Sequence, residues 1–183
     1  MQSPLDKRAT LVRCEISPGL PALKCPGTGG LWINGKEYWN WLRNQPSFPN
    51  LQQSTEGCDI YVEDTDRVVI SPASGRLMKK FRVGKGLGFR IDFDSATGGF
   101  WLDKDEYDAL QERGLHDELH LICDDDYQKK LRAHDRAESR RERLACALGN
   151  DGKNRVESLA AWAAEHPDTE LIRAYFLELL DNS

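Results

Sequence analysis

A line of five cationic side chains is the first feature of this sequence that could do chemistry. Its members are spaced three or four positions apart along a predicted helix: Lys129, Arg132, Arg136, Arg140 and Arg143. Residues with this spacing share one helix face, so the five side chains form a single basic stripe. Such stripes bind the phosphates of nucleic acids. The alternative is an ordinary solvated helix face, because Asp135, Glu138 and Glu142 moderate the charge of the same helix.

Two tryptophans form a second candidate site. Trp39 and Trp41 are two positions apart on another predicted helix, so they cannot both face inward. One of them could therefore be an exposed aromatic anchor for a partner protein, because aromatic residues dominate the binding energy of many interfaces. Packing against the neighbouring linker or against the C-terminal helices is the alternative.

Other reactive side chains have simpler structural explanations. His116 and His120 lie four positions apart but lack the HExxH pattern of a zinc protease. Cys123 precedes three aspartates, and a catalytic thiol needs the opposite, an electropositive surround. The run Gly84–Gly88 lacks both the GK[ST] ending of a phosphate-binding loop and the helix that should follow. These patterns indicate no enzyme active site.

Several carboxylates could in principle do acid–base chemistry. Asp92 and Asp94 alternate with apolar residues in a predicted strand, and solvation of that hairpin explains them. Asp103, Asp105 and Glu106 stand at the start of a predicted helix, where capping explains them.

Composition narrows the classes of protein further. The chain has 183 residues, a formal net charge of −5, 39% apolar residues and 30% charged residues, which is typical of a globular domain. No run of apolar residues is long enough to cross a membrane, and the N-terminus lacks the apolar stretch of a signal peptide. The five cysteines are an odd number at irregular spacing, so we expect a reducing, cytoplasmic setting rather than a disulfide framework.

An internal repeat organises the elements that must position these residues. A shift of 69 positions aligns Thr28-Gly29-Gly30 with Thr97-Gly98-Gly99, Trp32 with Trp101, and Glu37-Tyr38 with Glu106-Tyr107. Two copies cannot form a solenoid, so we interpret the match as a duplication. In the second copy, Phe89, Ile91 and Phe93 alternate with charged residues, which predicts a strand with an aromatic and a charged face. We expect a hairpin before each Gly-Gly pair and a short helix after it, over 34–43 and from 103 to about 113.

The rest of the chain divides into a linker and a helical part. Residues 44–57 are rich in Pro, Gln, Asn and Ser, and 60–62 and 68–70 look like extra strands. A long helix is expected from Asp124 to about Leu148, anchored at its two apolar ends, with Gly149 marking its end. Apolar residues at helical spacing over 154–165 and 168–180 predict a packed helical hairpin.

The second copy resembles the transcription-factor-IIB-like zinc-ribbon domains of bacterial proteins. Those domains carry a CPxCG knuckle, a hairpin, and then CxxCGGxWLDxxE before a short helix. Here the matching segments are Ser71-Pro72-Ala73-Ser74-Gly75 and Asp94-Ser95-Ala96-Thr97-Gly98-Gly99, followed by Trp101-Leu102-Asp103 and Glu106. The resemblance covers roughly residues 11–43 and 70–110.

The resemblance implies four zinc-ligand positions in each copy. In the second copy they are Ser71, Ser74, Asp94 and Thr97, and in the first copy Cys14, Ser17, Cys25 and Thr28. Structural zinc needs four tetrahedral ligands that are mostly thiolate or imidazole. Six of the eight expected cysteines are absent, so we predict a ribbon scaffold that holds no metal and uses no cofactor.

The sequence therefore predicts an α+β protein with two small, metal-depleted ribbon units packed together and a helical C-terminal part. The expected boundaries are 1–43 for the first repeat, 44–70 for the linker and extra strands, 71–114 for the second repeat and 115–183 for the helical region. The favoured function is a non-enzymatic protein-interaction or scaffold module in the bacterial cytoplasm, with no membrane partner. The alternative is a nucleic-acid-binding or transcription-related protein that uses the basic stripe.

Overall fold

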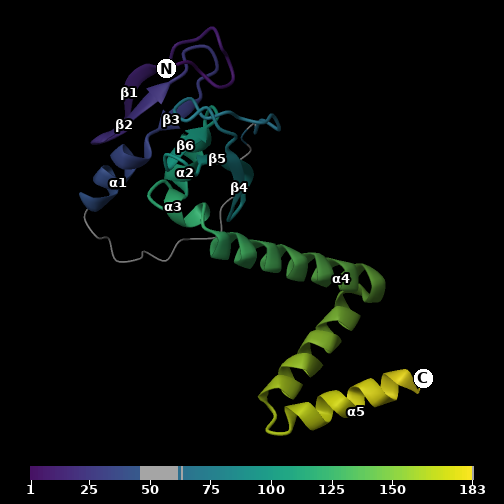
Figure 1. Ribbon diagram of the computed structural model, residues 1–183. Coiled ribbons are helices and arrows are strands. Elements are labelled where there is room, and N and C mark those ends of the chain that lie inside the picture. The colour runs from purple at the N-terminus through teal and green to yellow at the C-terminus, as the bar shows by residue number, and fades with distance from the viewer. Residues whose placement is uncertain (46–61, 63, 183) are drawn as a thin grey trace. The chain divides into compact units, whose positions relative to one another are not determined.

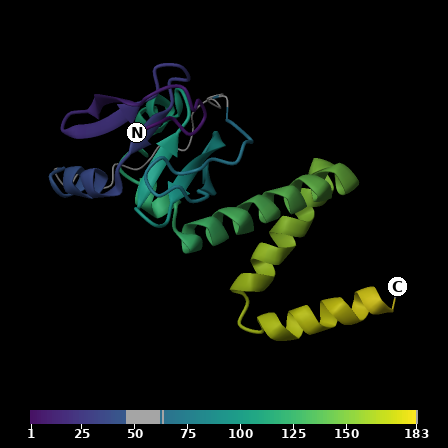
Figure 2. The same cartoon turned by 45° about the horizontal axis from the view of Figure 1, so that its top comes forward.

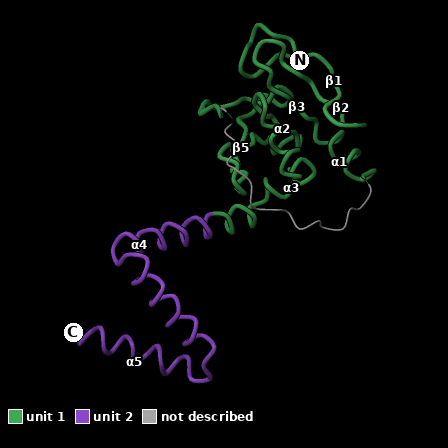
Figure 3. The backbone as a smooth tube through the Cα atoms, turned by 180° about the vertical axis from the view of Figure 1, so that it is seen from behind, with its two compact units in different colours: residues 1–131 green, residues 132–183 purple. Residues whose placement is uncertain are grey.

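The chain divides into two compact units, residues 1–131 and 132–183, which are coloured separately in Figure 3. The structure is a computed structural model, and it describes residues 1–45, 62 and 64–182. The predicted α+β class is confirmed, because an antiparallel sheet and five helices make up the described chain (Figure 1). We call residues 1–131 the N-terminal unit and residues 132–183 the C-terminal unit.

One six-stranded antiparallel sheet runs through the N-terminal unit in the order β1-β2-β3-β6-β5-β4. Its first half comprises β1 (Val12–Ser17), β2 (Leu20–Lys24) and β3 (Leu31–Ile33). Its second half comprises β4 (Lys79–Gly84), β5 (Leu87–Asp94) and β6 (Gly99–Leu102). The run Gly84–Gly88 holds the turn between β4 and β5, where Gly84 pairs with Leu87, so the hairpin predicted there is confirmed.

The two halves of the sheet meet through β3 and β6. Trp32 lies directly opposite Trp101 in this strand pair, and these are the two tryptophans that the shift of 69 positions aligns. Leu31 faces Leu102 and Ile33 faces Phe100, so the register is the same when read from either strand. The halves are therefore related by a local two-fold arrangement centred on the tryptophan pair.

Two glycines make room for these tryptophans. A Cβ atom on Gly30 would lie 2.3 Å from Cζ2 of Trp101, and one on Gly99 would lie 2.3 Å from Cη2 of Trp32. Each indole therefore rests on the backbone of the opposite half. This close approach explains the second glycine of each Gly-Gly pair, and the first glycine, Gly29 or Gly98, has a positive φ that favours glycine.

The sheet has a buried core on each face. On one face the helices cover Ile33, Phe89, Ile91, Phe100 and their neighbours. On the other face a smaller core surrounds the two tryptophans, and its members come from both halves: Leu11, Cys25, Trp32, Val69, Met78 and Trp101. Because both faces are covered, the predicted charged face of β5 is not solvated. Asp92 and Asp94 are only 2% and 1% exposed, which corrects the expectation that hairpin solvation explains them.

A short helix follows each half of the sheet, as predicted. Helix α1 (Gly35–Arg43) begins after Asn34, whose side chain accepts a hydrogen bond from the backbone N–H of Lys36. Helix α2 (Glu106–Glu112) begins later than predicted, because Asp105 adopts a left-handed conformation. Only half of the predicted capping box forms. Glu106 accepts from the backbone N–H of Asp103, whereas the Asp103 side chain accepts from Trp101.

Helix α3 (Leu119–Ile122) and the first turns of helix α4 (Asp125–Glu165) close the N-terminal unit. Asp124 caps α4, and Tyr127 donates to the backbone carbonyl of Val83.

Of the extra strands predicted between the repeats, Ile60 and Tyr61 lie outside the described residues. No strand forms over 68–70, so the expectation there is wrong: Ile70 makes an isolated bridge with Leu77, and the carbonyl of Val69 accepts from the N–H of Met78.

The C-terminal unit contains the rest of α4 and helix α5 (Thr169–Asp181), which are joined by a short turn (Figure 2). Gly149 has non-helical backbone angles inside α4, so the helix end predicted there is confirmed as a kink. The predicted packed hairpin is wrong. None of the residues of α5, all of which are described, is buried. Among the described helices, none is both long enough and apolar enough to cross a membrane.

Candidate functional site

The knuckle positions of the second half converge around one buried carboxylate. Asp94 Oδ2 accepts hydrogen bonds from Ser71 Oγ at 2.7 Å and from Thr97 Oγ1 at 2.6 Å, and Oδ1 accepts from the backbone N–H of Ala96. Burial opposes ionisation of this group, but the hydrogen bonds from Thr97, Ser71, Ala96 and Ser74 lower the pKa of Asp94 below its usual value. All four positions that the resemblance marks as metal ligands are therefore joined by hydrogen bonds.

The first half builds its knuckle from different residues than the sequence predicted. Cys14 and Ser17 lie in β1, where Cys14 Sγ contacts the carbonyl of Ala22 at 3.6 Å and Ser17 bonds with the hydroxyl of Tyr107. Neither residue stands in a knuckle turn with Cys25 and Thr28. The assignment of Cys14 and Ser17 to ligand positions is therefore corrected.

In the first half, Ser3 and Asp6 instead occupy the positions equivalent to Ser71 and Ser74. The backbone N–H of Asp6 donates to Ser3 Oγ at 3.3 Å, as that of Ser74 donates to Ser71 Oγ at 3.1 Å in the second half. Burial raises the pKa of the Cys25 thiol, but hydrogen bonds with Ser3 and Thr28 outweigh it and lower that pKa overall. A Ser-Pro pair begins both knuckles, at 3–4 and 71–72, and this signal could have found the correct register.

These ligand sets do not fit zinc. Ser3, Asp6, Cys25 and Thr28 offer one thiol, and the set around Asp94 offers none. A structural zinc site needs mostly thiolate or imidazole ligands, and hydroxyl groups are not a substitute. The side chains instead satisfy one another, with Ser71 and Thr97 donating to the Asp94 carboxylate.

We predict that the purified protein contains no stoichiometric zinc, as measured by elemental analysis. Treatment with a chelator should leave the melting temperature unchanged, whereas metal contributes about 10–16 kcal/mol to the folding of zinc-finger peptides. Replacing Cys25 by serine should likewise leave the metal content at background. About one zinc per chain, released only on unfolding, would contradict the prediction.

A cluster of four carboxylates is the most electrostatically unusual part of the N-terminal unit. Oxygen atoms of Asp64, Asp103 and Glu106 lie within 4.8 Å of one another, and Asp92 lies beside them. Lys80 Nζ contacts Asp92 Oδ2 at 2.8 Å, and Arg90 Nε contacts Asp64 Oδ2 at 2.8 Å. Two basic side chains, Lys80 and Arg90, therefore contact a cluster of four acidic side chains.

Burial strongly perturbs two of these carboxylates. Desolvation, together with the neighbouring Asp103 and Asp64 charges, raises the pKa of Glu106 to about 9. Desolvation also raises the pKa of Asp92 to about 6, although Lys80 opposes the change. Glu106 is therefore protonated at neutral pH, and its proton offsets part of the surplus negative charge.

Oxygen-rich clusters of this kind could hold a hard cation such as Mg²⁺ or Ca²⁺. Glu106 Oε1, Asp64 Oδ1 and Asp92 Oδ1 have no hydrogen-bond partner among the described residues, and either a proton on Glu106 or a bound cation would satisfy them. An O–H on Glu106 supplies a donor to this set of acceptors. Sequence reasoning noted Asp92, Asp103 and Glu106 but missed Asp64, which precedes β4 and carries no local signal.

The two candidate tryptophans have different environments. Trp41 is 5% exposed, and its Nε1 donates to the carbonyl of Pro18 at 3.1 Å. Trp39 is 44% exposed and contacts the ring of His120 in a tilted arrangement, with a centroid separation of 4.7 Å. Trp39 is thus the one of the pair that a partner could contact. His120 also bonds with the hydroxyl of Tyr38 at 3.1 Å, so it serves packing in this region.

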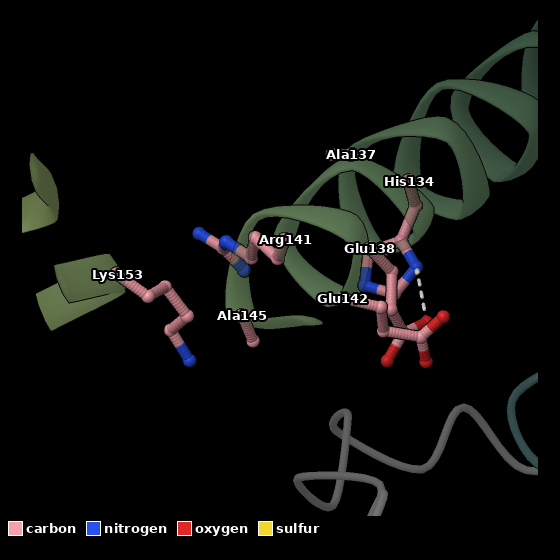
Figure 4. A pocket seen from close by; sticks show the side chains of 7 residues that line it. All are labelled: His134, Ala137, Glu138, Arg141, Glu142, Ala145 and Lys153. Carbon is pink, nitrogen blue, oxygen red and sulfur yellow. Dashed lines mark ion pairs between the residues drawn. The ribbon is translucent and has the colours of Figure 1, made fainter. Parts of the chain in front are cut away.

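The basic stripe is exposed along its whole length. Its most N-terminal member, Lys129, pairs with Asp126 at 2.8 Å, and the arginines of the stripe all lie in the C-terminal unit. The opposite face of the same helix borders a hollow of about 280 Å³, lined by His134, Ala137, Glu138, Arg141, Glu142, Ala145 and Lys153 (Figure 4). His134 and Glu138 approach to 4.0 Å there. The lining is mainly charged and comes almost entirely from one helix.

Large apolar side chains are exposed throughout the second part of the C-terminal unit. They are Leu148, Val156, Leu159, Trp162, Leu171, Tyr175, Phe176, Leu177, Leu179 and Leu180. We call this set the apolar C-terminal surface. Its exposure ranges from 40% for Leu159 and Phe176 to 70% for Leu171.

Comparisons of the chain with protein-family models, with curated proteins and with solved structures found no match.

Proposed function

We propose that this chain is a non-enzymatic protein-interaction module. In this proposal the N-terminal unit is a scaffold of two duplicated, metal-depleted zinc-ribbon-like repeats, and the C-terminal unit binds the partner. The observation that carries the proposal is the apolar C-terminal surface. Large apolar side chains gathered in this number on one unit are typical of interaction sites in soluble proteins.

The environment of the carboxylate cluster favours this proposal over an enzyme. Perturbed pKa values often mark catalytic groups. Here, however, Glu106 is 1% exposed, and the neighbouring hollow is lined by Lys104, Asp105 and Tyr107 rather than by Glu106. A group that no substrate can reach has a structural role, and the free thiols of Cys14 and Cys123 suit the cytoplasmic setting that we propose.

Affinity capture from the native host tests the proposed function. The bait is the full chain, compared with the double variant Leu171→Glu/Tyr175→Glu, which places charge on one face of α5. Val68→Glu is the matched control, because Val68 is 71% exposed but lies in the N-terminal unit. We expect a stoichiometric protein partner that the double variant loses and the control keeps. A partner retained by the double variant but lost with Trp39→Ala would move the site to Trp39.

Nucleic-acid binding through the basic stripe is the second candidate function, supported by the exposure of its four arginines. We predict no tight DNA or RNA binding at physiological salt, because the net charge of −5 opposes approach to a polyanion. Fluorescence anisotropy with labelled duplex and single strands checks this. A sub-micromolar affinity that falls steeply with salt and is lost in Arg132→Glu/Arg136→Glu/Arg140→Glu would establish the alternative instead.

A further inference from the structure

Three buried carboxylate oxygens of the N-terminal unit accept no hydrogen bond from any described residue. They are Asp64 Oδ1, Asp92 Oδ1 and Glu106 Oε1. The other oxygen of each side chain does accept one, from Arg90, Lys80 and the backbone N–H of Asp103 respectively. Asp92 and Glu106 are only 2% and 1% exposed, so bulk water does not satisfy their remaining oxygens. Three buried acceptors that lie in one cluster favour a positively charged ligand.

The spacing of the carboxylates suits a single ion. Oxygen atoms of Asp64, Asp103 and Glu106 all lie within 4.8 Å of one another. Ca²⁺ binds oxygen at about 2.3–2.6 Å and Mg²⁺ at about 2.0–2.1 Å, so two oxygens on opposite sides of one ion lie roughly 4–5 Å apart. One divalent cation can therefore contact all three side chains.

The charge of the cluster also matches a divalent cation. The four carboxylates carry four negative charges when they are ionised, whereas Lys80 and Arg90, which contact Asp92 and Asp64, supply two positive charges. Buried charge is stable only when it is compensated, and one Ca²⁺ or Mg²⁺ compensates the remaining two. In the absence of a cation, the proton on Glu106 offsets part of this surplus, so the proton and the cation are alternative occupants of the cluster.

The repeated fold does not itself require these carboxylates. Under the shift of 69 positions, Asp92 corresponds to Leu23, and each lies opposite the buried tryptophan of its own half. Asp103 corresponds to Asn34, which caps α1. The first half thus builds the same strand and helix with uncharged residues at both positions. Among the described residues, the acidic cluster occurs only in the second half, so a role specific to that half explains it better than the shared fold does.

We propose that Asp64, Asp103 and Glu106 bind one hard divalent cation, Ca²⁺ or Mg²⁺, beside Asp92. Ions of this class prefer carboxylate oxygens as ligands. The ion joins the segment before β4, the residue that follows β6 and the first residue of α2, and so ties the second half of the sheet to its helix.

The ion pairs of the cluster set the expected affinity. Calcium affinity depends on the number of charged ligands, and here Lys80 and Arg90 already compensate part of the charge. We therefore expect a Kd of about 0.1–1 mM, so that protein purified without divalent cations carries none. The side chains of Asp64 and Arg90 are 14% and 33% exposed, which places this side of the cluster next to solvent.

Thermal unfolding of the full chain in chelator-treated buffer tests the proposal. At about 10 mM CaCl₂ or MgCl₂, compared with NaCl of equal ionic strength, the melting temperature of the wild type should rise by roughly 3–10 °C. A rise with one salt identifies that cation as the ligand, and a rise with both shows that the site accepts either. No rise with either salt would overturn the proposal.

Two variants locate the bound ion. Glu106→Gln and Asp64→Asn each remove one charged ligand and keep the shape of the side chain, and the partial exposure of Asp64 makes its variant easy to accommodate. Tb³⁺, which stands in for Ca²⁺, should luminesce in the wild type when tryptophan is excited, because Trp101 donates to Asp103 within the cluster. Displacement of Tb³⁺ by Ca²⁺ or Mg²⁺ then gives their Kd.

Each cluster variant should raise this Kd at least tenfold. Glu37→Gln is the matched control, because Glu37 is the equivalent of Glu106 in the first half, and it should bind as the wild type does. Affinity that is unchanged in both cluster variants would place the cation on other acidic residues and overturn the proposal.

Discussion

Replacing Trp101 by alanine is expected to lower the free energy of unfolding by about 3–5 kcal/mol, the usual cost of truncating a buried tryptophan. Trp101 is fully buried, rests against the backbone of Gly30 and donates from Nε1 to Asp103 Oδ1 at 2.9 Å. The variant therefore loses packing between the two halves of the sheet and leaves the Asp103 carboxylate short of a donor. Urea unfolding followed by circular dichroism measures the loss.

Trp39→Ala is the matched control, because Trp39 is 44% exposed and its loss should change stability only slightly. Trp32→Ala should resemble Trp101→Ala, since Trp32 occupies the equivalent place on Gly99. The double variant Trp32→Ala/Trp101→Ala should show strong coupling between two residues in contact. An unchanged midpoint for Trp101→Ala would refute the account of the sheet centre.

Glu106→Gln is expected to make the protein more stable than the wild type at neutral and alkaline pH. The pKa of Glu106 is about 9 in the folded protein, against an ordinary value of 4.5. Between these two values the folded state binds one proton that the unfolded state does not. The wild type therefore loses stability as pH rises through this window, by up to about 1.4 kcal/mol per pH unit.

The glutamine is uncharged at every pH and keeps both an acceptor for the N–H of Asp103 and a donor for the carboxylates. Above about pH 6, where Asp92 has also titrated, the stability of the Glu106→Gln variant should therefore depend less on pH than that of the wild type. Thermal unfolding across this range checks the result. Glu37→Gln is the control, because Glu37 lies 69 positions earlier, is partly exposed and pairs only loosely with Arg13, at 3.9 Å.

The carboxylate cluster offers a further check with divalent cations. If the proton on Glu106 completes the cluster, Mg²⁺ or Ca²⁺ should not raise the melting temperature of the wild type. A concentration-dependent rise that disappears in Glu106→Gln would show that a cation replaces the proton and that the cluster is a metal site.

The sequence predicted best where local and tertiary signals agree. Both Gly-Gly-x-Trp segments form central strands, and Asn34 caps its helix, because glycine, tryptophan and asparagine each suit those positions through local physics. The kink at Gly149 was also predictable, since glycine tolerates a conformation that ends a helix.

Predictions failed where the decisive partner was distant in the chain. The first knuckle was assigned to Cys14 because cysteine is the usual zinc ligand, and the shared Ser-Pro pair at 3–4 and 71–72 was not used. The carboxylate cluster depends on Asp64, which reaches Arg90 across 26 positions. Helical periodicity predicted a packed hairpin in the C-terminal unit, but periodicity shows only that a face needs covering and not which molecule covers it.

The pairing of β3 with β6 has a consequence for how the protein is made. Until β6 leaves the ribosome, β3 is an unprotected edge strand whose free N–H and C=O groups can pair with any extended chain. The contact between Trp32 and Trp101 must close a long loop, which makes it late in folding and slow compared with each hairpin. A fragment that ends before residue 99 should therefore aggregate, and co-expression with residues 62–131 should rescue it by supplying the missing edge.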